Sequence, residues 1–171
     1  MIEGHNIRLR VWREDDLPIL TALRNDVDLQ AQLLARVRGS NAEQVLRWLK
    51  DRTDRLLLVI SDRRSDVILG YLQVGEMNTV DRHAVLGICL APDARGRGLG
   101  GEAINLVCDY LRNIWGMRKL SLRVRADNTA ALRCYERVSF ERCGLLKQHF
   151  YLDGCGRDVV LMERLLEGGT D

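Results

Sequence analysis

Residues 91–101, which read APDARGRGLGG, place four glycines and two arginines between a short apolar run and an amphipathic stretch. The apolar run, residues 85–90, is followed by Pro92 and predicts a buried strand. From 98 to 115 apolar side chains recur every three or four residues, which predicts a helix of roughly four to five turns. The glycines therefore stand where a strand ends and a helix begins, and the middle of the chain must fold as strand, tight turn and helix.

This turn has the composition of an anion site. A helix N-terminus carries unpaired backbone N–H groups and about half a positive charge. Glycines let an anion approach those donors, and Arg95 and Arg97 add charge and forked donors, so the segment predicts a site for phosphate or diphosphate. The spacing Gly96-x-Gly98-x-x-Gly101 also matches the dinucleotide-binding fingerprint, but that motif belongs in a first βαβ unit and here lies past the middle of the chain. An exposed turn without a ligand is the other alternative.

A second motif, NxxAxxxYxxxxF over residues 128–140, follows the alternating strand expected at 120–125. Taken with the RGRGLG segment at 95–100, it resembles the GNAT superfamily of N-acetyltransferases, which transfer an acetyl group from acetyl-CoA to an amine. The resemblance extends over residues 7–165. Within the superfamily, the branch that contains ribosomal-protein, spermidine and amino-sugar acetyltransferases is the most similar.

The resemblance implies an α/β fold, the GNAT fold, with a central mixed, mostly antiparallel sheet of about seven strands and about four helices. In that fold the fourth and fifth strands splay apart, and the pantetheine arm of CoA lies in the gap. The hydrophobic patterns predict a strand, two helices, three strands, a helix, a strand, a helix and two strands, with a helical or mobile segment at 28–38. A chain of 171 residues has room for one core, so residues 1–171 are expected to form a single N-acetyltransferase domain.

The composition limits the kinds of molecule that the protein is expected to bind. A formal net charge of +2, from 26 basic and 24 acidic side chains, argues against nucleic-acid binding by bulk electrostatics. No apolar run approaches the roughly 20 residues of a membrane span and the first residues lack a signal-peptide core, so a cytoplasmic location without membrane contact is expected. The five cysteines are scattered without a CxxC pair, so neither a disulfide framework nor a metal site is expected. The sequence leaves the oligomeric state open, a homodimer included.

The resemblance also implies where the cosubstrate, acetyl-CoA, binds. Its diphosphate would lie on the backbone N–H groups of the glycine-rich segment, and Asn128 would contact CoA or the acetyl region. Asn is equally a favoured N-cap residue, and capping alone would explain Asn128. The cosubstrate-binding residues expected are Leu90, Arg95, Gly96, Arg97, Gly98, Leu99, Gly100 and Asn128.

Acetyl transfer needs a neutral amine, a polarised thioester and a proton for the departing thiolate. A phenol can supply that proton, and the resemblance gives this role to Tyr135, whose alternative is a core aromatic on an apolar helix face. Many members of the superfamily carry a glutamate early in the fourth strand to receive the amine proton, but the matching position here is apolar, near Val85. Glu76 and His83 are the remaining catalytic candidates, beside a chain of water molecules.

The first two helices and the loops near the last strands set the acceptor in this superfamily. Acidic side chains there would hold a polyamine, whereas residues 30–38 carry two glutamines and two arginines, with Asp26 and Asp28 the only nearby acids. We therefore expect a small-molecule or peptide amine, either a nucleotide-linked amino sugar whose diphosphate meets the arginines or a protein N-terminus. A polyamine acceptor and a catalytically weak or inactive acetyl-CoA-binding sensor or assembly subunit stay open as alternatives.

Overall fold

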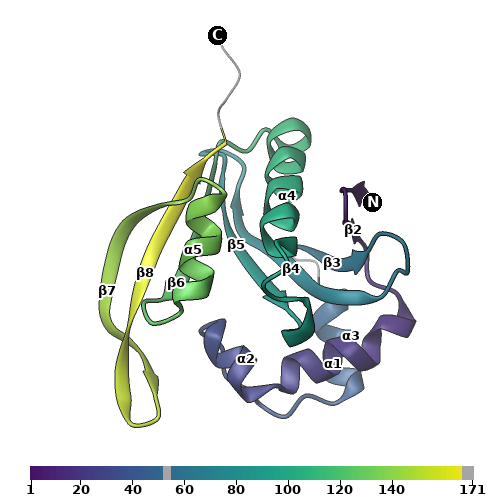
Figure 1. Ribbon diagram of the computed structural model, residues 1–171, viewed down its shortest axis with the longest axis horizontal. Helices are drawn as coiled ribbons and strands as arrows, with labels where there is room; N and C mark the ends of the chain where they lie inside the picture. Colours follow the sequence, from purple (N-terminus) through teal and green to yellow (C-terminus); the bar gives the residue numbers. More distant parts are fainter. Residues whose placement is uncertain (52–54, 167–171) are drawn as a thin grey trace.

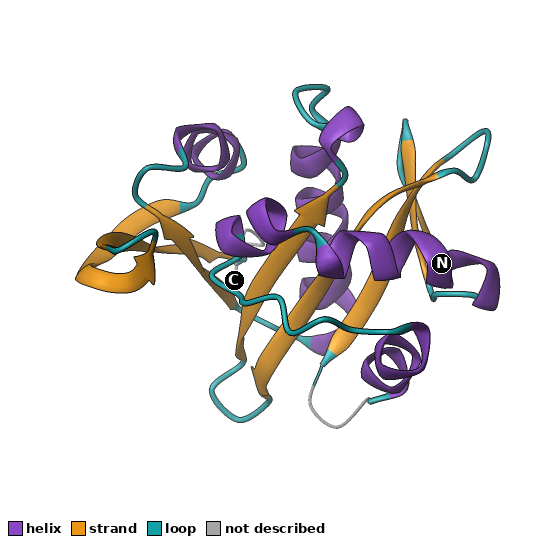
Figure 2. Cartoon of the chain, turned by 90° about the horizontal axis from the view of Figure 1, so that it is seen from below, coloured by secondary structure: helices purple, strands orange, loops and turns teal. Residues whose placement is uncertain are grey.

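A single mixed sheet with helices on both faces forms the computed structural model, which describes residues 1–51 and 55–166 (Figures 1 and 2). The strands run in the spatial order β1-β2-β3-β4-β5-β6-β8-β7. Among the strands of these described residues, the β5–β6 pair alone is parallel, and the other neighbours are antiparallel. The strands are β1 (Ile2–Glu3), β2 (Ile7–Arg10), β3 (Leu56–Asp62), β4 (Ile68–Asn78), β5 (His83–Leu90), β6 (Lys119–Arg125), β7 (Glu141–Leu152) and β8 (Cys155–Leu165).

The helices begin where polar caps and glycines predict. The Asn41 side chain accepts a hydrogen bond from the Gln44 N–H (2.9 Å) and starts the third helix. Gly116, with a φ of 63°, ends the longest one in the left-handed conformation that glycine adopts most easily. No helix in the described ranges is both long and apolar enough to cross a bilayer. The helices are α1 (Leu17–Asn25), α2 (Val27–Gln32), α3 (Ala42–Lys50), α4 (Leu99–Trp115) and α5 (Thr129–Arg137), with short 3-10 turns at Glu14–Asp16 and Pro92–Ala94.

Each face of the sheet buries its own apolar layer. On one face, α4 and α5 pack against alternate residues of the strands; Leu72, Leu86 and Ile104 belong to the same buried cluster there. On the other face, α1 and α3 cover Val59 and Tyr71. Each fully buried aliphatic side chain contributes about 1.5 to 3 kcal/mol, so the two layers together hold the helices to the sheet.

The expected splay between the fourth and fifth strands is confirmed and lies between β5 and β6. These strands pair only from His83 to Val85, whereas β5 continues to pair with β4 as far as Leu90. The second half of β5 therefore presents backbone groups that no neighbouring strand satisfies on the β6 side. Such groups can pair with an extended polar ligand.

The structure adds one strand and one helix to the expected numbers. The two-residue strand β1 pairs with β2, with Ile2 opposite Leu9, and is too short to show an alternating pattern. The additional helix α2 occupies the start of the segment 28–38, and the Asp26 carboxylate caps it by accepting from the Leu29 N–H (2.8 Å). The hairpin turn at Asp153 and Gly154, both with positive φ, is as predicted.

Candidate active site

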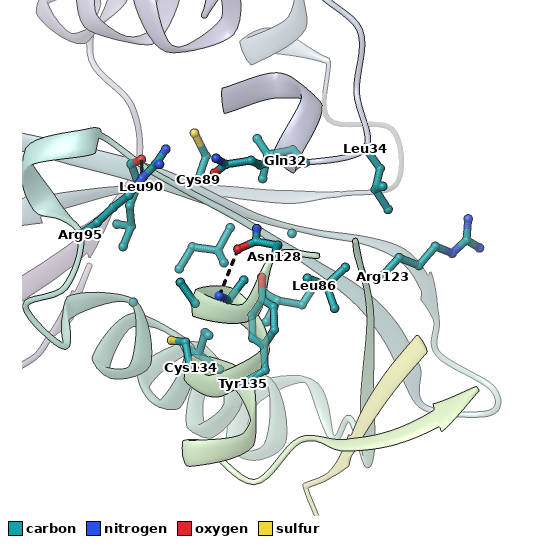
Figure 3. Close-up of a pocket in the computed structure, with 18 of the residues that line it drawn as sticks. Gln32, Leu34, Leu86, Cys89, Leu90, Arg95, Arg123, Asn128, Cys134 and Tyr135 are labelled. Carbon is teal, nitrogen blue, oxygen red and sulfur yellow. Dashed lines mark hydrogen bonds between the residues drawn. The ribbon is translucent and has the colours of Figure 1, made fainter. Parts of the chain in front are cut away.

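A cavity of about 990 Å³ lies where β5 and β6 separate. Figure 3 shows Tyr135 and Cys134 of α5 on one side of the strands, and Gln32 of α2 with Cys89 on the other. The cavity is thus lined from both faces of the sheet. A donor entering from the α4–α5 side and an acceptor entering from the α2 side can meet inside it.

The start of α4 forms one end of the cavity. Gly96 and Gly98 have φ of 72° and 78°, and no side chain of the described residues caps α4 at Gly98. The first N–H groups of the helix are therefore available to an anion. A Cβ at Gly100 would lie 3.2 Å from the Leu90 Cδ1 and 3.7 Å from the Cys134 Sγ, so glycine there lets strand, helix α4 and helix α5 converge.

The two arginines of this segment, Arg95 and Arg97, lie in different places relative to the cavity. The Arg95 Nε donates to the carbonyl oxygen of Leu90 (3.2 Å), which holds the guanidinium at the cavity wall. Arg97 is exposed and does not line the cavity. Of the cosubstrate-binding residues expected, the structure brings to the cavity Leu90, Arg95, Gly96, Gly98, Leu99, Gly100 and Asn128.

Tyr135 and Asn128 each combine the two roles that the sequence leaves open. The Tyr135 ring packs against the core and lies 6.0 Å from the Phe140 ring, centroid to centroid, yet it also lines the cavity. Burial raises the pKa of the Tyr135 phenol well above its ordinary value, so the group is protonated. The Asn128 Oδ1 accepts from the Ala131 N–H (3.2 Å) and caps α5, while the residue lines the cavity.

The structure separates the two candidates for receiving the amine proton. The register of β4 and β5 shifts between Gly75 and Asn78, and Glu76 inside that bulge has a φ of 49°. A bulge re-aims a side chain, and Glu76 lines the cavity beside Val85. His83 does not line it.

His83 instead lines a smaller cavity of about 350 Å³. That cavity is at the other end of the β5–β6 pair, with Arg82 and Lys119 in its wall. The structure therefore brings Glu76, but not His83, to the same cavity as Tyr135.

Sequence reasoning missed a bulge in β7 that contributes to the cavity wall. Leu146 pairs with Val159 and Phe150 with Arg157, so three residues of β7 stand opposite one residue of β8. Within the bulge, the Gln148 N–H donates to the Asp158 Oδ1 (2.7 Å).

This bulge brings His149 and Phe150 to the cavity. Gln32, one of the two glutamines of the segment 30–38, also lines it, and further lining residues that the sequence did not single out are Leu29, Leu33 and Leu34 near α2, Arg123 of β6, and Arg133 and Arg137 of α5. Of these residues, only Arg123 had a signal in the sequence. It is a polar residue in the alternating strand 120–125, on the face opposite to that of the apolar residues.

The architecture and the motifs agree with a comparison against known families. The family model described as acetyltransferase (GNAT) domain matches residues 6–141. The chain belongs to the GNAT acetyltransferases. As a GNAT enzyme it is an N-acetyltransferase that uses acetyl-CoA.

Full-length relatives of this GNAT chain are known. Spermidine N(1)-acetyltransferase of Vibrio cholerae is 32% identical over 159 residues, which is 91% of each sequence. The enzyme of the same name from Escherichia coli K12 is 27% identical over 167 residues, covering 95% of this chain and 87% of the relative. The crystal structure of spermidine N-acetyltransferase from Vibrio cholerae in complex with CoA and spermine matches with a TM-score of 0.87 at 24% identity, covering 94% of this chain and 96% of that one. At that identity the structural match concerns the fold.

Proposed function

We propose that the enzyme transfers the acetyl group of acetyl-CoA to a primary amine of a small aliphatic polyamine of the spermidine class. The observation that carries the chemistry is one cavity lined both by Tyr135 of α5 and by Glu76 of β4. The similarity to two spermidine acetyltransferases, over about nine-tenths of each sequence, supports the acceptor class. It reverses the order of acceptors expected from residues 30–38, which favoured an amino sugar or a protein N-terminus.

The donor binds along the strand edge that the splay exposes. Its diphosphate accepts hydrogen bonds from the backbone N–H groups at Gly98 to Gly100, with Arg95 beside it. The pantetheine amides pair with the free backbone groups of β5 between Leu86 and Leu90. This arrangement puts the thioester where β5 and β6 part, within the cavity that Tyr135 lines.

The acceptor enters from the α2 side and meets Glu76. A free amine with a pKa near 10 is only about 0.1% neutral at pH 7, so a group that takes its proton is required. The Glu76 carboxylate attracts the ammonium and receives that proton through water. The nitrogen then attacks the carbonyl carbon and the C–N bond forms. The nitrogen gives its second proton to water, and the C–S bond breaks. The Tyr135 phenol gives its proton to the departing sulfur and regains one from solvent.

The test measures free thiol release from acetyl-CoA with spermidine, a nucleotide-linked amino sugar and a peptide with a free N-terminus. We expect the highest kcat/KM with spermidine. Tyr135→Phe should lower kcat by about ten-fold or more and leave the Kd of CoA within a few-fold, because only the proton donor is lost.

Each other outcome has a definite meaning. Turnover with only the amino sugar or the peptide contradicts the polyamine acceptor. Saturable CoA binding without turnover of any amine contradicts the enzymatic proposal and favours an acetyl-CoA sensor. An unchanged kcat in Tyr135→Phe removes Tyr135 from the mechanism.

A further inference from the structure

The acceptor side of the cavity carries a cation that the proposed polyamine chemistry does not use. Arg123 lies in β6 between Leu122 and Val124, which are buried in the layer below α4 and α5. Because side chains alternate along a strand, Arg123 projects to the opposite face, the face of α2. It is exposed and lines the cavity.

Arg123 differs from the next arginine on the same strand. Arg125 forms an ion pair with Asp127 (2.8 Å) and also donates to the carbonyl oxygen of Ala31. Within residues 1–51 and 55–166, by contrast, no carboxylate lies within salt-bridge distance of the Arg123 guanidinium. Its charge is therefore available to a ligand in the cavity.

Glu76 and Arg123 give the acceptor side two opposite poles. They come from β4 and β6, on either side of β5, and Arg123 lies beyond the last β5–β6 pair, Val85 with Ser121. Val85 and Gly87 of β5 line the same cavity, and the Gln73 amide of β4 lies beside Gly87. Figure 3 shows Arg123 at the same end of the cavity as Leu34 and Leu86, away from Arg95 and Leu90 at the donor end. A guanidinium at the acceptor end suits an acidic group on the acceptor.

We infer that the enzyme has a further activity: it acetylates amines that carry an acid group, a carboxylate or a phosphonate, at the far end of a short apolar chain. The amine meets Glu76, and the acid group accepts paired hydrogen bonds from the Arg123 guanidinium. The chemistry is the same acetyl transfer, so this inference rests on the proposed function. It adds a class of acceptor different from spermidine, the amine for which the two relatives are named.

Three acceptors that share a five-carbon chain show how the group at the end opposite the reacting amine affects kcat/KM. These are pentylamine, 1,5-diaminopentane and 5-aminopentanoate, which end in a methyl group, an ammonium and a carboxylate. Their kcat/KM values are measured by thiol release at a fixed, saturating concentration of acetyl-CoA, together with that of spermidine. We expect 5-aminopentanoate to exceed pentylamine by about ten-fold.

Variants of Arg123 then assign the effect. Arg123→Gln should bring 5-aminopentanoate down to the level of pentylamine, leave pentylamine unchanged, and raise the value for spermidine because a repelling charge is gone. Arg123→Glu should favour 1,5-diaminopentane over 5-aminopentanoate. Arg112→Gln removes an exposed arginine of α4 outside the cavity and should change none of the ratios.

The outcomes separate this inference from the proposed function. If spermidine is turned over and the three five-carbon amines have equal kcat/KM values, the anion-binding role of Arg123 is overturned, whereas the proposed function stands. A loss in Arg123→Gln that is equal for pentylamine and 5-aminopentanoate also overturns it, because such a loss reports a general defect. No turnover with any amine, spermidine included, overturns both.

Discussion

Asp66 shows how a single side chain joins distant parts of the chain. Its carboxylate accepts hydrogen bonds from the Ser61 hydroxyl (3.0 Å), from the Arg10 Nε (3.1 Å) and from Arg13. Arg10 is buried and also pairs with Asp16 (2.7 Å). Burial acts to raise the pKa of Asp66, but these donors outweigh it and lower the pKa to about 2. The network ties β2 and the start of α1 to the β3–β4 turn.

Asp66→Asn should therefore lower the free energy of unfolding by about 1 to 2 kcal/mol at pH 7, since buried Arg10 loses one of its two charged partners. The native pKa of Asp66 is depressed, so its contribution is complete above pH of about 4 and is lost as the pH falls toward 2. Urea unfolding of both proteins across this range measures the difference.

The gap between wild type and Asp66→Asn should narrow steadily on acidification. A gap that stays constant between pH 4 and pH 2 would contradict the assigned pKa. Asp109→Asn removes an exposed i,i+3 pair with Arg112 and serves as the control, with an expected cost below about 0.5 kcal/mol.

At the scale of elements, the start of α4 requires a left-handed backbone conformation that glycine adopts most easily. Gly98 has a φ of 78°, and Gly39, which does not line the cavity, has a φ of 67°; a Cβ at either would meet no atom within 4 Å. Gly98→Ala and Gly39→Ala should therefore each cost about 1 to 2 kcal/mol of stability through backbone strain alone. Only Gly98→Ala should also raise the KM for acetyl-CoA, by about five-fold or more, because the donor N–H groups shift.

Steady-state kinetics with acetyl-CoA as the varied substrate, together with thermal unfolding, checks this pair. An equal KM in both variants would place the diphosphate elsewhere. A raised KM in Gly39→Ala would mean that the measurement reports stability and not the geometry of the binding loop.

The elements that the sequence predicts well are those specified by neighbouring residues. The periodicity over 98–115 and the glycines before it specify α4 and its start, and Asp153 with Gly154 specifies the β7–β8 turn. The β7 bulge depends on partners in the next strand. A Cβ at Gly156 would lie 2.7 Å from the Gln148 Cβ, and Asp158 holds the Gln148 N–H. Residues 141–152 read alone indicate an ordinary strand.

The catalytic candidates illustrate the same limit. Glu76 and His83 flank one turn between strands, so sequence position ranks them equally. Their separation depends on the bulge in β4 and on the short β5–β6 pairing, both of which are set by packing between strands. Tyr135 and the segment around Gly98 were predictable because each belongs to a motif of the family, whereas His149 and Arg123 belong to none.

For the whole molecule, the splay makes the sheet two blocks joined by three residue pairs between β5 and β6. A bound acetyl-CoA that pairs with β5 should join these blocks. We expect it to slow hydrogen exchange at residues 86–90. We also expect Tm to rise with acetyl-CoA concentration, because a hundred-fold excess over Kd adds about 2.7 kcal/mol to the free energy of unfolding.

Hydrogen exchange measured by mass spectrometry with and without CoA tests this expectation. β2 and β3, which lie away from the cavity, provide the internal reference and should not change. Slowed exchange confined to the start of α4 would mean that the diphosphate binds there without the pantetheine arm entering the gap.

The two sides of the cavity are built by separate parts of the molecule. α4 and α5 rest on one apolar layer, and α2 with the bulged part of β7 rests on another around Ala31 and Phe150. A mutation that reshapes α2 or the bulge therefore leaves the packing beneath α4 untouched. Over evolutionary time a lineage can inherit the donor half unchanged while its acceptor half diverges, so neighbouring descendants can share one activated acyl carrier and modify chemically different amines.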